Sequence, residues 1–394
     1  MENPQRQSSD ERLPQLDSIR GIAALFVVFN HYIQIIPEHL RPPTSLAALF
    51  SITTWASPVT WLRFTPLRLM VDGQAAVDLF FVLSGFVLAL SLTQFSQPTT
   101  LPFFIKRFCR VYFPFAGVIL MVAAAHDVIP TAPSPTVSNW VNGLLVPHGE
   151  YSLTAHLLMR GREKDMRLDP VMWSLVHEMR VSLFFPAIFL SIRRIGAAWA
   201  VSACLIISCL ASVGMSDSIS GDWQATLHFL WMFAAGSALS YHRADVVRLI
   251  RSFGRRVILS LWILTITLLI VPFDRVWADF LIGGGASLLI CLCLDRSRIA
   301  DALGWPTLLW VGRISYSLYL IHLPILIFAA TNGFAGWALV AVFMLTLALS
   351  ELTYRSLEQP SHRIGIKLAG AIGTAQRTKL GRANPEGPIS EKSS

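Results

Sequence analysis

Ionisable side chains stand inside long apolar segments of this sequence, where they are costly unless they have a partner or a chemical role. Arg20 and His31 lie in the first such segment, eleven residues apart. Eleven residues close about three helical turns, so both side chains are expected on one face, about 16 Å apart along the axis. His31 can then act as a general base or a nucleophile. The alternative is a membrane anchor for Arg20 and an interfacial histidine for His31.

Two carboxylates occupy comparable positions in other apolar segments. Asp78 lies about one turn into the second segment, and Glu178 lies in the fourth at a depth similar to that of His31. A carboxylate at that depth can orient an imidazole and raise its basicity. Alternatively, Glu178 forms a purely structural cluster with His177 and Arg180.

Hydroxyl and aromatic groups accompany these residues. Ser315, Tyr319 and His322 form a polar stripe at helical spacing in the ninth segment. Ser84 can donate a hydrogen bond to a developing oxyanion, although Ser84 and Gly85 also have the small side chains that favour close helix packing. The supporting residues expected around the site are Ser84, Trp173, Ser174, Tyr316, Tyr319 and His322.

A pair of arginines opens the third apolar segment. Arg107 and Arg110 are three residues apart and face the same way on a helix. Two guanidinium groups on one face can clamp a phosphate, and the same pattern is typical of an orientation anchor. Together with Arg20 they predict a basic mouth at the cytoplasmic end of the helices, opposite the histidines and carboxylates.

The composition indicates which solvent surrounds these groups. Of 394 residues, 54% are hydrophobic and only 14% are charged, whereas soluble domains carry about 25% charged residues. Lipid is therefore the expected solvent. The net charge of +8 comes from residues between the apolar segments, a pattern that sets membrane orientation and argues against nucleic-acid binding. The five cysteines lack metal-site spacing, so no metal is expected.

Ten apolar stretches predict an all-α integral membrane protein, a bundle of about ten transmembrane helices. The stretches cover residues 18–36, 74–93, 111–128, 172–192, 197–215, 224–241, 257–272, 276–294, 308–330 and 335–357. Lys and Arg cluster in the loops after the second, fourth, sixth and eighth stretches, which predicts that both termini are cytoplasmic. We expect a cytoplasmic tail over residues 1–15, a transmembrane domain over 16–360 and a polar, partly disordered cytoplasmic tail over 361–394.

Five motifs, in this order, resemble the acyltransferase-3 family of bacterial membrane-bound O-acyltransferases. They are Leu16-Asp17-x-x-Arg20-Gly21 with His31, Phe80-Phe81-x-x-Ser84-Gly85-Phe86, Arg107-x-x-Arg110 with Pro114, Trp173-Ser174-Leu175-x-x-Glu178, and Ser315-Tyr316-x-x-Tyr319-x-x-His322. The resemblance covers about residues 16–360. It implies the acyltransferase domain only, without the C-terminal esterase-like domain that some relatives carry.

The resemblance implies the transfer of an acyl group, commonly acetyl, from acyl-coenzyme A to a hydroxyl of a sugar, glycan or other small acceptor. Acyl-coenzyme A is then a co-substrate, and no permanently bound cofactor is implied. The expected location is the inner or plasma membrane, which the chain crosses several times. The pattern departs from the family at Val181 and Ser182, where relatives usually have Phe-Tyr, and at the intruding Arg180, so we expect a different pocket beside Glu178.

The family's functional residues correspond to positions in this sequence. The expected catalytic residues are His31, Glu178 and Asp78, and the expected donor-binding residues are Arg20, Arg107 and Arg110. In this interpretation Glu178 or Asp78 orients His31. His31 then acts as general base in one step, or takes the acyl group itself in two, and the sequence leaves both routes open.

A proton-coupled transporter is the alternative function, with His31, Asp78 and Glu178 as a proton relay. Intramembrane carboxylates fit that function, but the sequence has no inverted repeat and no matching pair of broken helices. A sensory or scaffold protein is a third alternative, and it leaves the intramembrane ionisable residues without a role.

Overall fold

The computed structural model describes residues 13–37, 61–62, 65–93, 100–129, 131–145, 153–161, 166–216, 220–271, 275–295 and 302–383, which contain helices and no strand. The first eight elements are α1 (Pro14–Gln34), η4 (Pro66–Val71), α3 (Gly73–Thr93), α4 (Thr100–Val128), α5 (Asn139–Leu144), α6 (Leu153–Leu157), α7 (Met172–Ile195) and α8 (Ala197–Ser212). The remaining elements are α9 (Trp223–His228), α10 (Leu230–Tyr241), α11 (Arg243–Ser252), α12 (Arg255–Leu269), α13 (Arg275–Leu294), α15 (Pro306–Thr331), α16 (Ala338–Thr353), η6 (Tyr354–Glu358) and α17 (Gln359–Ala383).

Six helical segments among the described residues are long and apolar enough to cross a membrane, so the chain is a multi-pass membrane protein. They lie in α3, α4, α7, α13, α15 and the continuous stretch Ala338–Gly373. Other predicted spans form shorter or more polar helices. The helices α8 and α12 have only 16 and 15 residues, fewer than the ~20 that a typical bilayer requires. The stretch 224–241 is divided into α9 and α10 by a turn at Phe229.

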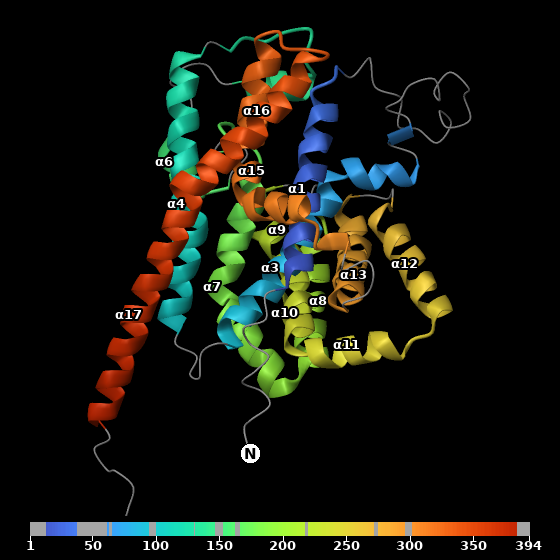
Figure 1. Cartoon of the computed structure of the whole chain (residues 1–394), viewed down its shortest axis with the longest axis vertical. Coiled ribbons are helices and arrows are strands. Elements are labelled where there is room, and N and C mark those ends of the chain that lie inside the picture. Colours follow the sequence, from blue (N-terminus) through green and yellow to red (C-terminus); the bar gives the residue numbers. More distant parts are fainter. Residues whose placement is uncertain are drawn as a thin grey trace, which may run out of the picture.

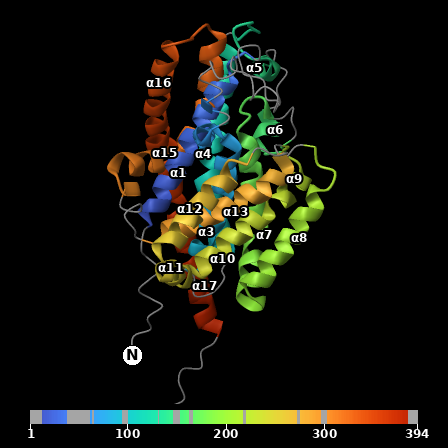
Figure 2. The ribbon, with the colours of Figure 1, turned by 90° about the vertical axis from the view of Figure 1, so that its right-hand side faces the viewer.

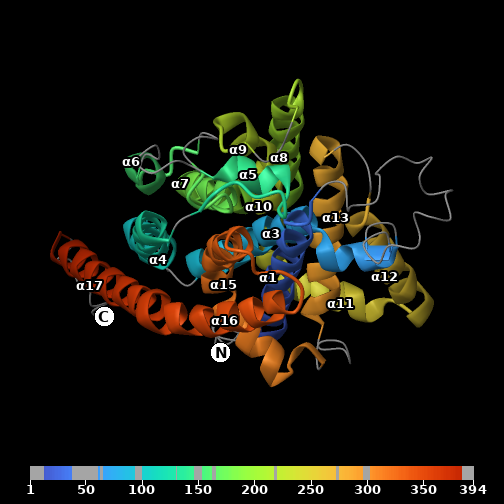
Figure 3. The ribbon, with the colours of Figure 1, turned by 90° about the horizontal axis from the view of Figure 1, so that it is seen from above.

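Three helices form the centre of the bundle. Viewed from above, α1, α3 and α15 lie in the middle, with α7 to α10 on one side, α11 to α13 on another and α4, α16 and α17 on the remaining sides (Figure 3). The helix α17 ends at the lower end of the molecule as drawn (Figures 1 and 2).

The residues that follow Pro360 do not form a separate tail. They continue the helix from η6 as α17, which packs along α4 (Figure 1). Gly365 faces Cys109 of α4, and Ala369 is buried. The polar composition of this segment therefore marks a helix with one buried face, and the predicted domain end at residue 360 falls inside it. Residues 1–12 and 384–394 of the predicted tails lie outside the described residues.

Glycines allow the central helices to approach closely. Gly85 of α3 lies against α10, and a Cβ added there would be 2.2 Å from the carbonyl oxygen of Phe233. On the facing helix, a Cβ on Gly236 would be 1.9 Å from the carbonyl oxygen of Val82. Gly85 therefore serves close helix packing, as its small side chain indicated. The same contact limits how far α3 can slide along α10.

Replacing Gly85 by alanine is expected to lower the free energy of unfolding by about 1–3 kcal/mol, because backbone atoms that cannot move aside occupy the space for the new methyl group. Gly284→Ala in α13 is the matched control, since no atom lies within 4 Å of its added Cβ, and alanine there raises helix propensity. Thermal unfolding of both variants in the same detergent tests the difference. Equal melting temperatures would contradict the close approach of α3 and α10.

Candidate functional site

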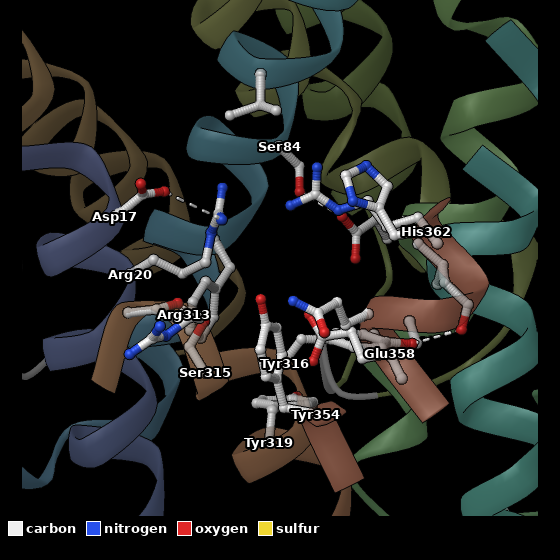
Figure 4. Close-up of a pocket in the computed structure, with 18 of the residues that line it drawn as sticks. Asp17, Arg20, Ser84, Arg313, Ser315, Tyr316, Tyr319, Tyr354, Glu358 and His362 are labelled. Carbon is white, nitrogen blue, oxygen red and sulfur yellow. Dashed lines mark hydrogen bonds and ion pairs between the residues drawn. The ribbon is translucent and has the colours of Figure 1, made fainter. Parts of the chain in front are cut away.

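A cavity of about 560 Å³ opens between α1, α3, α4, α7, α15 and the η6–α17 junction. Its polar lining residues are Asp17, Arg20, Ser84, Arg107, Arg110, Ser174, Glu178, Arg313, Ser315, Tyr316, Tyr319, Tyr354, Glu358, Gln359 and His362. Figure 4 shows many of these side chains arranged around the empty space. Residues from the beginning, middle and end of the chain therefore meet at one site. The π-helical turn η6 contributes two of them, and such turns are frequent at functional sites.

The carboxylate of Glu178 is held by groups from two neighbouring helices. It forms an ion pair with the guanidinium of Arg107 and accepts a hydrogen bond from the hydroxyl of Ser84. The Nε of Arg107 also donates to the hydroxyl of Ser182, at 2.9 Å. Only 10% of the Arg107 side chain and 18% of the Glu178 side chain are exposed, so each of the two buried charges depends on the other.

The departure from the family pattern has a structural explanation. The Ser182 hydroxyl accepts a hydrogen bond from Nε of Arg107. Its small polar side chain stands next to the ion pair at a position where relatives usually have a large aromatic residue. Arg180 turns away from the cavity: it donates to the carbonyl oxygens of Gly221 and Arg160 and lies over the ring of Trp223. Arg180 therefore fastens connecting segments to α7 and does not narrow the pocket.

Two arginines of the cavity make no direct hydrogen bond or ion pair with the described part of the chain: Arg110 and Arg313. Arg110 lies in the electrostatic field of Arg20, Arg107 and Glu358, and it faces the cavity. Arg20 has a long contact with Asp17, 3.8 Å between Nη1 and Oδ1. Unpaired guanidinium groups in a partly enclosed space attract anions, phosphates above all.

Tyr319 forms the wall of the cavity nearest the middle of α15. Its hydroxyl is 2.7 Å from the hydroxyl of Ser174 and donates to the carbonyl oxygen of Val171 at 3.2 Å. Asp169, in the turn before α7, is fully buried, and desolvation raises its pKa well above the ordinary value.

His31 lies behind this wall and contacts His322. The Nδ1 atom of His31 is 3.0 Å from Nε2 of His322, and the indole of Trp140 stacks on the His31 ring with 5.7 Å between centroids. The His322 ring lies 6.0 Å from the Tyr319 ring, centroid to centroid. Neither histidine lines the cavity itself, so Tyr319 and Ser174 stand between the cationic cavity and the histidine pair.

Asp78 belongs to a different, fully buried cluster. Gln74 donates to Asp78 at 3.5 Å and to Asp279 of α13 at 3.3 Å. The other oxygen of Asp279 is 3.0 Å from Nε2 of His228. Across the described ranges, no three His, Cys, Asp or Glu side chains are grouped so as to hold a metal ion.

The family model described as an acyltransferase domain, acyltransferase-3, matches residues 13–355. The chain belongs to the acyltransferase-3 family.

Named relatives of this acyltransferase-3 chain are O-acetyltransferases. "Putative O-acetyltransferase SACOL0978" of Staphylococcus aureus (strain COL) is 28% identical over 90% of this chain and 58% of its own length. "O-acetyltransferase OatA" of Staphylococcus aureus (strain NCTC 8325 / PS 47) is 24% identical over 84% of this chain and 59% of its own. "Putative peptidoglycan O-acetyltransferase YrhL" of Bacillus subtilis (strain 168) is 31% identical over 26% of this chain and 18% of its own.

The chain spans less than two thirds of the length of these curated relatives. No solved structure matches it.

The structure brings most of the predicted site residues of this acyltransferase-3 chain to one cavity. These are Arg20, Ser84, Arg107, Arg110, Ser174, Glu178, Tyr316 and Tyr319. Four others lie elsewhere. His31 and His322 form their own pair, Asp78 is in the second cluster, and Trp173 packs edge-on against Phe81 beneath the cavity lining.

Among the residues that the structure describes, His31 makes no hydrogen bond or ion pair with a carboxylate, contrary to the expectation. Glu178 is bound to Arg107 and Ser84, and the polar neighbour of His31 is His322. Glu178 of α7 instead lies at the level of Arg107 of α4, with which it forms an ion pair.

The sequence did not predict several of the residues that line the cavity, nor the stacking of Trp140 on His31. The lining residues that were not assigned a site role are Asp17 of α1, Trp310 and Arg313 of α15, Tyr354 and Glu358 of η6, and Gln359 and His362 of α17. A usable signal was the spacing of Glu358 and His362, which are four residues apart and share a helix face. Trp140 lies on the short helix α5, where no periodicity indicates a partner.

Removing one member of the buried ion pair is expected to destabilise the protein strongly. Arg107→Met leaves the Glu178 carboxylate with Ser84 as its remaining partner and should cost about 3–5 kcal/mol, whereas the double variant Arg107→Met/Glu178→Gln should recover most of that loss. Thermal unfolding of the single and double variants measures both. Arg251→Met is the control, because its pair with Asp295 leaves 62% of the Arg251 side chain exposed and should contribute less than about 1 kcal/mol. Equal losses in the single and double variants would contradict the pairing.

Proposed function

We propose that this acyltransferase-3 chain transfers an acyl group, acetyl in the first instance, from acyl-coenzyme A to a hydroxyl group of a glycan acceptor. The observation that supports this proposal best is the placement of an arginine-rich cavity directly next to a histidine pair, with the Tyr319 wall between them. The O-acetyltransferase names of the relatives, one of them a peptidoglycan O-acetyltransferase, suggest a cell-wall glycan as the acceptor.

The donor occupies the cavity in this proposal. The phosphate groups of coenzyme A bind to Arg110 and Arg313, which have no ion-pair partner among the described residues, and to Arg20, whose contact with Asp17 is long at 3.8 Å. Arg107 is committed to Glu178 and shapes the wall. Along α1, the Arg20 level is about 16 Å from the His31 level, so the pantetheine arm has to extend from the phosphates past Tyr319.

His31 performs the proton transfer at the far end. Its imidazole takes the proton of the acceptor hydroxyl while the oxygen attacks the thioester carbonyl carbon. The C–S bond then breaks, the acyl group stays on the acceptor oxygen, and the thiolate of coenzyme A receives the proton from His31. The Ser174 and Tyr319 hydroxyls can serve as oxyanion donors only by turning their hydrogens away from the Val171 carbonyl, which both approach in this structure. Ser84, expected in that role, donates to Glu178 instead.

The proton-relay alternative gains no support from the arrangement of its three residues. Among the described residues, His31 contacts His322, Glu178 contacts Arg107, and Asp78 contacts Gln74. These contacts belong to three different clusters. Acyl transfer requires only that the thioester reach His31.

Reconstituted vesicles test the function directly. The protein is supplied with radiolabelled acetyl-coenzyme A on one side and peptidoglycan glycan fragments on the other, and label in the fragments is measured together with free thiol. We expect one thiol released for each acetyl group transferred. Proton-coupled uptake of a solute without thiol release would overturn the proposal and support a transporter.

A further inference from the structure

The hydrogen bonds of the histidine pair fix where the protons are. Nδ1 of His322 is 3.0 Å from the carbonyl oxygen of Leu318, one turn earlier in α15. A carbonyl oxygen can only accept, so Nδ1 of His322 carries a hydrogen. In a neutral imidazole the other nitrogen is then an acceptor, and Nε2 of His322 therefore offers a lone pair.

This lone pair determines the state of His31. Nδ1 of His31 is 3.0 Å from Nε2 of His322, so Nδ1 must donate. With its hydrogen on Nδ1, neutral His31 keeps its lone pair on Nε2, the nitrogen on the other side of the ring.

The surroundings make this arrangement rigid. His322 and Leu318 are fully buried in α15, and Trp140 stacks on the His31 ring at an angle of 15°, which restricts rotation of the imidazole. Within the described part of the chain, Nε2 of His31 has no recorded hydrogen-bond partner, and the side chain is partly exposed. The ring thus presents an available base nitrogen.

We propose that His322 is a positioning residue: it accepts the Nδ1 hydrogen of His31 and thereby holds His31 in the tautomer whose Nε2 can take the proton of the acceptor hydroxyl. This inference rests on the proposed function of His31. In many catalytic sites a carboxylate orients the histidine. Here the neutral imidazole of His322 has that position, and the Leu318 carbonyl orients His322 in turn. When His31 takes up the proton, its imidazolium still donates the Nδ1 hydrogen to the lone pair on Nε2 of His322.

Two substitutions of His322 separate this role from packing. His322→Gln can place a carboxamide oxygen where Nε2 was and still accept from His31. His322→Asn can satisfy the Leu318 carbonyl but is too short to reach His31. We expect the Gln variant to keep kcat within about threefold and the Asn variant to lose about 100-fold or more in kcat, with the affinity for acetyl-coenzyme A unchanged in both.

The tautomer itself is measured by nitrogen NMR of protein labelled with ¹⁵N-histidine, with the His31 signals assigned from their loss in His31→Ala. We expect an Nδ1–H imidazole in the unsubstituted protein and in the Gln variant, and a mixed or Nε2–H imidazole in the Asn variant. Full kcat with an unchanged tautomer in His322→Asn would overturn the inference. Full activity in His31→Ala would instead overturn the proposed function, so the two failures are distinguishable.

Discussion

Replacing His31 by alanine is expected to reduce kcat for acyl transfer by about 100-fold or more, because a positioned general base contributes about 10²–10⁴ to the rate. Binding of acetyl-coenzyme A should be unchanged, since the cationic cavity does not include His31. The two quantities are measured on the same preparation, the first by thiol release and the second by equilibrium binding of labelled donor. In a two-step route, trapped label on the protein should disappear in the same variant.

His242→Ala is the matched control for this experiment. His242 lies between α10 and α11 with 44% of its side chain exposed and contacts Asp245, so it has no relation to the cavity. It should retain full activity. Full activity of His31→Ala, in protein that binds the donor normally, would remove His31 from the chemistry and with it the proposed mechanism.

Hydropathy and helical periodicity predicted the features that are set within a single helix, namely its apolar character and which of its residues share a face. The all-helical membrane architecture is confirmed, and Arg20, Arg107 and Arg110 indeed face one cavity. Six long apolar helices are described rather than about ten, because apolar composition does not by itself determine helix length. The break at Phe229 and the continuation of α17 past Pro360 depend on contacts with other helices, which one segment does not encode.

Which site residues meet depends on which helices lie side by side, and the sequence of a single helix does not specify its neighbours. His31 and His322 are 291 residues apart and meet because α1 packs against α15 through Gly21 and Gly312. The spacing of residues specifies the position of a side chain along its own helix, but not the neighbouring helix that it faces. Position along the helix alone predicted the level of His31 for Glu178, whereas in the structure Glu178 pairs with Arg107.

Arg110 is the arginine whose removal should weaken donor binding most cleanly. It faces the cavity without a direct partner among the described residues, whereas Arg107 is paired with Glu178. A hydrogen bond to a charged group contributes about 1.5–3 kcal/mol. Arg110→Ala should therefore raise the Kd for acetyl-coenzyme A by about ten- to hundredfold, with little change in kcat, because the phosphates bind equally in the ground and transition states.

A truncated donor makes this test specific. Acetyl-pantetheine lacks the nucleotide phosphates, so Arg110→Ala should be no worse than the unsubstituted protein with that substrate. Arg256→Ala, at the exposed start of α12, controls for a general loss of positive charge and should behave normally with both donors. An Arg110→Ala penalty of equal size with acetyl-pantetheine would show that Arg110 maintains the shape of the cavity and does not bind phosphate. A penalty confined to acetyl-coenzyme A would place the phosphates at Arg110, and the thioester would then extend toward His31.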